Sequence, residues 1–177
     1  MQCTIIEGFN NNIERLESAC SEVVKCVGDK LTELEWSQDK PDLLFSIKIV
    51  SVIKPNNPEI HSYLKSLESI EFPRQIDTIG IQDAKRLMET FIGMSDPNVH
   101  SILILDEDCW KIMLPPESQV ILDQMFQRAS EHNASIFVSC QQYTQLPNSI
   151  LSKTTTLIHG YTMMPGSHRK QIQVDLI

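Results

Sequence analysis

The sequence contains no long hydrophobic run. None of its apolar stretches approaches the roughly 18 to 20 residues that a membrane-spanning helix needs. Near the N-terminus, Glu7 interrupts the stretch in which a secretory signal peptide would need uninterrupted apolar residues. These absences predict a soluble, unsecreted, cytoplasmic protein without a membrane partner.

Cysteine is scarce and scattered. The chain has five cysteines, an odd number, and no C-x-x-C pair of the kind that binds zinc. This distribution favours reduced thiols in a cytosolic compartment over a disulfide framework, and it argues against a zinc site. The five are Cys3, Cys20, Cys26, Cys109 and Cys140.

The sequence also lacks an excess of positive charge, because its formal net charge at pH 7 is -8. This balance argues against a broadly basic nucleic-acid surface, although a ring or pore can present a few basic residues on an acidic subunit. With 177 residues, 41% of them hydrophobic, the chain is long enough for one domain with a sizeable core. We therefore expect a single domain over residues 1–177.

A phosphate-binding loop is present only in part. The P-loop pattern is G-x-x-x-x-G-K-[ST], in which glycines let backbone N–H groups surround the phosphates and the lysine contacts them. The segment GFNNNIER, residues 8–15, follows an apolar run and precedes a helical pattern, but only Gly8 fits. Ile13 replaces the second glycine, Glu14 the lysine and Arg15 the hydroxyl residue. Residues 8–15 therefore form a degenerate version of this loop.

The chain does contain short, continuously apolar segments that alternate with helical patterns. Strands that are apolar throughout are typical of a parallel sheet covered by helices on both faces. The pattern predicts an α/β fold with a central, mostly parallel sheet. The predicted strands are 3–7, 43–54, 71–80, 101–108, 134–142 and 154–161, with 171–177 as a further candidate. The predicted helices are 13–27, which Gly28 would end before a loop over 29–41, then 81–93 and 118–131.

The strand SILILDED, residues 101–108, has the form of a Walker B strand. Its apolar residues would hold it in the centre of the sheet, and its acids would lie at the edge where open α/β sheets bind ligands. Asp106 would coordinate Mg²⁺, and Glu107 would act as the base that polarises an attacking water. The simpler alternative is that many parallel strands end in acids because the next element begins there.

A second polar residue ends the following buried strand, residues 135–142. Gln141 lies one helix after the acids, where RecA-like P-loop motors keep a residue that senses the γ-phosphate. The alternative is that Gln141 and Gln142 merely cap a strand.

Several blocks, in order, resemble the poxvirus-type genome-packaging ATPases of large DNA viruses, within the FtsK/HerA group of P-loop motors. SILILDED is similar to the Walker B block of that family, and RASEHNASIFVSCQQYTQLP is similar to its Arg-His, strand, Gln, aromatic and Pro series. NSILSKTTTLIHGY resembles its closing segment, and residues 46–64 more loosely resemble its second strand. The residues that match the second block are His132, Ser135, Gln141, Tyr143 and Pro147.

The resemblance implies a RecA-like P-loop NTPase-type three-layer sandwich and an ATPase that drives double-stranded DNA into a capsid. It implies Mg-ATP as cofactor, a homo- or hetero-oligomeric ring, viral capsid proteins as partners, and the host cytoplasm or the virion as location. Asp106 would bind the metal, and Glu107 and Gln141 would be catalytic. Gly8, Asn12 and Arg15 would contact the nucleotide.

The degenerate loop leaves the function open. A carboxylate at Glu14 would lie where triphosphate charge is densest, which argues against ATP binding of the usual P-loop kind. Arg15 could supply a cation, but its planar fork does not replace a compact lysine charge. The alternatives are a non-catalytic paralogue that acts as a structural or regulatory partner of an active subunit, and an unrelated Rossmann-like domain whose block order matches by chance.

Overall fold

A computed structural model describes residues 2–9, 12–35, 44–51, 67–68, 74–80, 99–106, 111, 115–132, 134–162 and 170–176. Its centre is a seven-stranded sheet of order β3-β2-β4-β5-β1-β6-β7. Neighbouring strands are parallel except for β7, which runs antiparallel to β6. The strands are β1 Gln2–Gly8, β2 Leu44–Ser51, β3 Arg74–Gly80, β4 Val99–Leu105, β5 Ser135–Cys140, β6 Thr156–Thr162 and β7 Lys170–Leu176. The predicted α/β fold with a mostly parallel sheet is confirmed.

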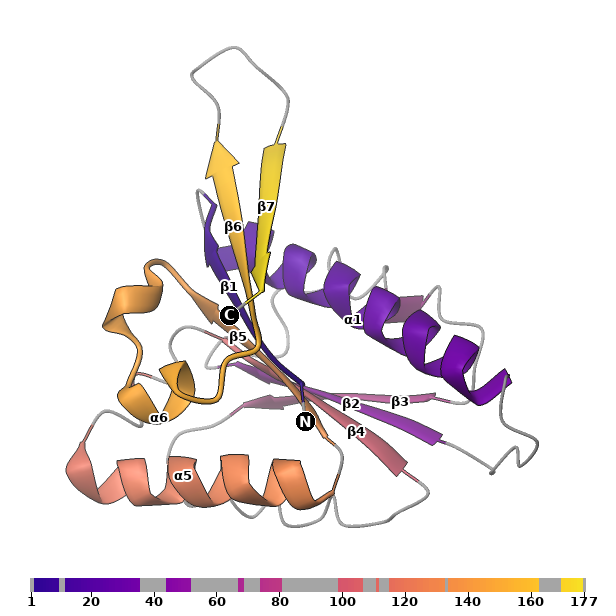
Figure 1. Ribbon diagram of the computed structural model, residues 1–177, viewed down its shortest axis with the longest axis horizontal. Coiled ribbons are helices and arrows are strands. Elements are labelled where there is room, and N and C mark those ends of the chain that lie inside the picture. Colours follow the sequence, from indigo (N-terminus) through magenta and orange to yellow (C-terminus); the bar gives the residue numbers. More distant parts are fainter. Residues whose placement is uncertain are drawn as a thin grey trace.

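Helices cover both faces of the sheet (Figure 1). Helix α1, Asn12–Glu35, lies on one face, and α5, Pro116–Glu131, lies on the other together with the short α6, Asn148–Leu151. A 3-10 turn, η1 over Tyr143–Gln145, connects β5 to α6. The result is the predicted three-layer sandwich.

The two faces of β1 supply two separate cores, because successive strand residues point to opposite sides. Ile5 packs in the cluster under α5, with Phe126 and Val138. Ile6 packs in the cluster under α1, with Leu16 and Phe137. All six side chains are at most 1% exposed. The central strands are therefore buried on both faces, which is why they are apolar throughout.

The strand order separates this fold from the Rossmann arrangement. In the order 3-2-1-4-5-6 the first strand lies beside the second. Here β4 and β5 lie between β1 and β2. The alternative of an unrelated Rossmann-like domain therefore does not fit the strand order of this sheet.

The connections that leave the neighbouring strands β5 and β1 run in opposite directions across the sheet, toward β6 and β2 respectively. The connection from β1 to β2 carries α1 on one face, and the connection from β4 to β5 runs the opposite way with α5 on the other face. Parallel crossovers are right-handed, so a reversal of direction moves the helix to the other face. Ligands of open α/β sheets bind at the carboxyl edge beside such a reversal. This rule places the expected ligand site at the carboxyl ends of β4, β5 and β1.

One predicted helix boundary is wrong. The first helix was expected to end at Gly28 and to be followed by a loop, but α1 continues through Gly28 to Glu35. Glycine inside a helix costs only about 1 kcal/mol. Val27 is buried in the core under this helix and Leu31 packs against it, so packing outweighs that cost.

Smaller differences occur at the other predicted elements. The helix expected from 118 begins at Pro116, because proline suits the first helical positions. The sensor-like strand expected over 135–142 ends at Cys140, so Gln141 and Gln142 lie beyond it. β4 ends at Leu105, and Asp106 follows it directly. Residues 107–108 and the predicted helix 81–93 lie outside the described residues.

Within the part of the chain that the structure describes, no helix is long and apolar enough to cross a membrane. The cysteines that the structure describes, Cys3, Cys20, Cys26 and Cys140, are reduced. The same described residues contain no group of three or more His, Cys, Asp or Glu side chains placed to hold a metal ion.

Candidate functional site

Three of the residues singled out in the sequence lie at one edge of the sheet. Gly8 ends β1, Gln141 follows β5 and Asp106 follows β4. These three strands are consecutive in the order β4-β5-β1 and run parallel, so their carboxyl ends meet. Asn12 is the first residue of α1, which begins just after this edge. Glu107 lies outside the described residues.

Asp106 is fully buried at the end of β4. Taking a carboxylate out of water is costly unless it is hydrogen-bonded, paired or bound to a cation. Carboxylate oxygen is also the ligand type that Mg²⁺ prefers. The burial and position of Asp106 therefore fit a magnesium ligand.

The last residue of β1 and the residue after it, where the loop begins, both have left-handed backbone conformations. Gly8 has φ of 78° and Phe9 has φ of 61°. A side chain at Gly8 would place its Cβ 2.2 Å from the carbonyl oxygen of Gly160 in β6. Glycine is thus required at position 8 for both conformation and space.

The first two N–H groups of this loop bind to protein carbonyls. Gly8 N–H donates to the Gln141 carbonyl at 3.3 Å, and Phe9 N–H donates to the Gly160 carbonyl at 3.1 Å. These bonds attach the loop to the ends of β5 and β6. A phosphate at the loop would therefore depend on the N–H groups at the start of α1, where the helix dipole favours an anion.

Arg15 does not extend into solvent. Its side chain is 5% exposed, and its Nη1 donates to the carbonyl oxygen of Gly8 at 3.2 Å. The guanidinium therefore links the second turn of α1 to the beginning of the loop.

Carboxylates surround the groove beside the loop. This groove has a volume of about 220 Å³. Its carboxylates would repel a triphosphate, and the amine of Lys25 is already paired with Glu22. The residues that line it are Phe9, Glu14, Glu17, Ser18, Ser21, Glu22 and Lys25.

Sequence reasoning missed one contact at this edge. Glu7, just before the loop, contacts His159 of β6, with 2.5 Å between Oε1 and Nδ1. Its other oxygen, Oε2, accepts a hydrogen bond of 2.6 Å from the N–H of Tyr143. No local pattern links Glu7 to His159, because only the β1–β6 register aligns them.

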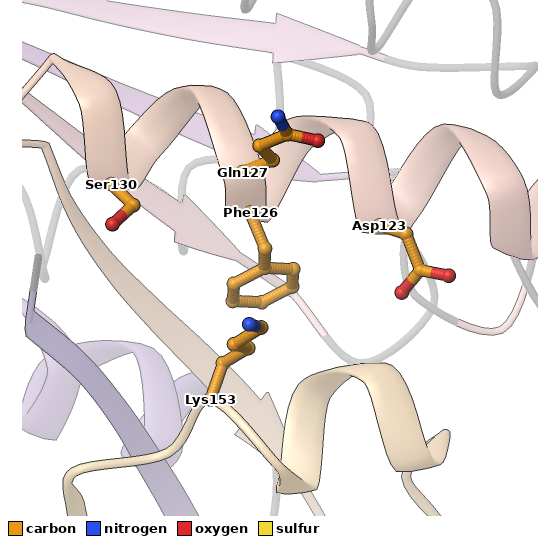
Figure 2. Close-up of a pocket in the computed structure, with 5 residues that line it drawn as sticks. All are labelled: Asp123, Phe126, Gln127, Ser130 and Lys153. Atoms are coloured by element: carbon orange, nitrogen blue, oxygen red, sulfur yellow. The ribbon is translucent and has the colours of Figure 1, made fainter.

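A larger cavity lies away from this edge (Figure 2). It has a volume of about 410 Å³ and lies between α5 and Lys153, which precedes β6 and so marks the amino ends of the strands. Figure 2 shows the Phe126 ring directed toward Lys153. This cavity belongs to the opposite end of the sheet from Asp106 and Gly8. Its lining residues are Asp123, Phe126, Gln127, Ser130 and Lys153.

Comparison with solved structures finds the same fold in several ATPases. The chain matches B204, the DNA-packaging ATPase from Sulfolobus Turreted Icosahedral Virus, with a TM-score of 0.57 and 13% sequence identity over 93% of this chain and 77% of that one. It also matches EssC (ATPases 2 and 3) from Geobacillus thermodenitrificans, with a TM-score of 0.51, 11% identity and 99% of this chain covered. The fold is that of the RecA-like P-loop ATPases.

A third match is the cytoplasmic domain of EssC, with a TM-score of 0.53 and 11% identity. The chain spans only 38% and 39% of the two EssC chains. No protein-family model matches the sequence, and no match was found among curated proteins. At these identities the structural comparisons establish the P-loop ATPase fold alone.

Proposed function

We propose that the chain is a viral DNA-packaging ATPase-like motor subunit of the FtsK/HerA group, which acts in an oligomeric ring on double-stranded DNA. The observation that carries this proposal is the meeting of Gly8, Gln141 and Asp106 at the carboxyl ends of three consecutive strands. The structural similarity to B204 supports it. Capsid proteins as partners, and the host cytoplasm or virion as location, follow from the proposal.

The residues at this edge fit Mg-ATP in part. Asp106 would hold Mg²⁺, and the start of α1 at Asn12 would hold phosphate through backbone N–H groups. Gln141, whose side chain is exposed, would contact the γ-phosphate, and Glu107 would orient and deprotonate the attacking water. When bound, Mg²⁺ supplies the positive charge that neutralises the phosphate oxygens.

The fit is incomplete at the loop itself. Glu14 and Glu17 line the neighbouring groove, and Arg15 is hydrogen-bonded to Gly8. Residues 8–15 contain no lysine that could contact the phosphates. We therefore propose that nucleotide binding depends mainly on the metal ligand and the helix terminus, and that hydrolysis is impaired.

Titration calorimetry of Mg-ATP with the purified chain tests the proposal. We expect measurable binding that requires Mg²⁺ and disappears in Asp106→Asn, because an amide removes the charge of the metal ligand. The matched control is Asp123→Asn, an exposed acid on α5 at the other cavity, and it should leave binding unchanged. Absence of binding to the wild-type chain would overturn an ATP-driven motor function.

A second candidate is a non-catalytic partner of an active subunit. The Arg15 contact with Gly8, and the N–H groups of Gly8 and Phe9 bound to protein carbonyls, favour it. The test is the double change Ile13→Gly with Glu14→Lys. Recovered or strengthened nucleotide binding would indicate a decayed phosphate site that this chain no longer uses. If the double change does not increase nucleotide binding, the hypothesis that an ancestral phosphate loop decayed loses its main support.

A further inference from the structure

Glu7 contacts two segments at the carboxyl edge at once. It is the residue before Gly8 in β1, and its register partners are Cys140 in β5 and His159 in β6. One carboxylate oxygen pairs with His159 Nδ1 at 2.5 Å, and the other accepts the Tyr143 N–H at 2.6 Å. The Glu7 and His159 side chains are only 14% and 15% exposed. A single side chain thus joins β1, the segment after β5 and β6.

Further contacts join the same three segments. Gly8 N–H donates to the Gln141 carbonyl, and Phe9 N–H donates to the Gly160 carbonyl. The rings of Tyr143 and His159 meet edge to face, with 6.5 Å between their centroids. The loop start is therefore bonded to the backbone of Gln141 on one side and to the end of β6 on the other.

The segment that carries Gln141 needs such an anchor. The side chains of residues 141–145 are all exposed, and η1 has no side-chain hydrogen bond at its N-cap. Burial resumes only at Leu146, which is 5% exposed. The Glu7 carboxylate holds the Tyr143 N–H at the beginning of η1, and Leu146 holds the other end. A hydrogen bond to an ionised acceptor is roughly twice as strong as one between neutral groups.

We propose that Glu7 is a positioning residue that holds the Gln141 segment in register with the loop that begins at Gly8, and that His159 fixes the orientation of the Glu7 carboxylate. In this arrangement an anion at the loop and the side chain of Gln141 share one rigid frame. The role of these contacts in binding a triphosphate rests on the proposed function. The frame itself consists of contacts within this chain.

Amide exchange of Tyr143, measured by ¹⁵N-resolved NMR on the full chain, tests the positioning. In Glu7→Ala we expect the exchange rate of this amide to rise roughly 10- to 100-fold, the effect of losing a hydrogen bond to a charged group. In Glu7→Gln the side-chain carbonyl oxygen can still accept the bond, so most of the protection should return. Glu22→Gln, which removes a carboxylate of similar exposure from α1, is the control and should change nothing at Tyr143.

A direct measurement needs no substitution. A scalar coupling across the hydrogen bond, between the Tyr143 ¹⁵N and the Glu7 carboxylate ¹³C, should be present in the wild-type chain. Its absence, or unchanged Tyr143 exchange in a folded Glu7→Ala, would overturn the proposal. Equal loss of Tyr143 protection in Glu7→Gln and Glu7→Ala would also count against it. That result is expected if both variants simply loosen the packing, whereas the positioning role requires Glu7→Gln to keep most of the protection.

Adding Mg-ATP separates this inference from the proposed function. In wild type and Glu7→Gln we expect Mg-ATP to change the NMR chemical shifts of the backbone amides of both Gly8 and Gln141. In Glu7→Ala only the Gly8 amide resonance should change. If Mg-ATP shifts no amide in the wild type, the nucleotide function fails, while the exchange and coupling results still decide the role of Glu7. If Gln141 shifts equally in Glu7→Ala, the positioning role is wrong although binding stands.

Discussion

Gly8 and Gly160 show how closely the backbone approaches itself beside the candidate site. A Cβ on Gly8 would lie 2.2 Å from the Gly160 carbonyl oxygen, and a Cβ on Gly160 would meet the Phe9 ring at 2.3 Å. The first neighbour is backbone and cannot move without shifting β6. The second is a side chain that can rotate away. Position 8 is therefore the more strictly constrained of the two.

We predict that Gly8→Ala destabilises the fold. The left-handed conformation alone costs a residue with a Cβ roughly 1–2 kcal/mol, and the contact with Gly160 adds to that cost. Urea unfolding followed by circular dichroism measures the change. Gly28→Ala is the matched control, because apart from the neighbouring residues of its own helix no atom lies within 4 Å of a Cβ at position 28, and we expect it to stabilise by roughly 0.5–1 kcal/mol. Equal stability of Gly8→Ala and wild type would contradict the described loop conformation.

Two buried thiols make the stability depend on pH. Burial raises the pKa of Cys3 from 9.0 to about 12, although a hydrogen bond with Thr154 acts in the opposite direction. Burial also raises the pKa of Cys20 from 9.0 to about 12, and the negative charge of Glu17 adds to the effect. Between these values the unfolded chain loses the protons that the folded chain keeps. The free energy of unfolding is therefore unaffected below pH 9.0 and falls as the pH rises toward 12.

We predict a loss of roughly 1.4 kcal/mol per thiol and per pH unit within that window. The measurement is urea unfolding at pH 8.5 and pH 10 under reducing conditions. Cys20→Ala should lose about half of the thiol contribution to the pH dependence, since one of the two thiols is gone. Ser21→Ala, an exposed change next to it in α1, should keep the wild-type dependence. The burial of Cys20 is refuted if both variants behave alike.

At the scale of elements, packing decided what local patterns could not. Gly28 was expected to end the first helix, yet α1 runs on to Glu35 because residues on both sides of Gly28 pack on the core. In α5, packing likewise separates a buried face from an exposed one. Phe126 is 1% exposed in the core, whereas Val120 is 58% exposed.

We predict that Phe126→Ala lowers the free energy of unfolding by about 3–5 kcal/mol, as expected for a buried ring that leaves a cavity between α5 and the sheet. Val120→Ala on the outer face of the same helix should change it by less than about 0.5 kcal/mol. Chemical unfolding of the two variants measures the difference. Similar losses in both would mean that α5 does not pack on the sheet through the Phe126 face.

At the scale of the whole molecule, the net charge of -8 limits how the chain can bind DNA. An acidic subunit binds duplex DNA through a local group of basic residues, and a ring multiplies such groups around the strand. We predict that DNA binding accompanies oligomerisation and weakens at least about tenfold between 50 and 200 mM salt, the effect of two or more phosphate contacts. Sedimentation velocity with a fluorescent duplex measures both. A DNA complex that contains a single copy of the chain, or binding that does not respond to salt, would count against the ring.

The amino-acid sequence by itself determined the fold class and the composition of the sheet edge. The predicted strands 3–7 and 101–108 are recognisable because burial on both faces requires continuous apolar residues, and this requirement is local. The same apolar patterns also placed Asp106 and Gln141 at the carboxyl ends of buried strands. These predictions needed only period, composition and spacing.

Tertiary structure decided which strand ends meet and what holds them together. The sequence contains no signal that places β4 and β5 between β2 and β1, since parallel pairing joins residues far apart in the chain. The same pairing aligns Glu7 with His159 and brings the Gly8 N–H to the Gln141 carbonyl. Glu14 and the missing lysine showed that the loop was degenerate. Only the folded chain shows that its first N–H groups and Arg15 are bonded within the protein, because those bonds depend on the position of β5, β6 and α1 around the loop.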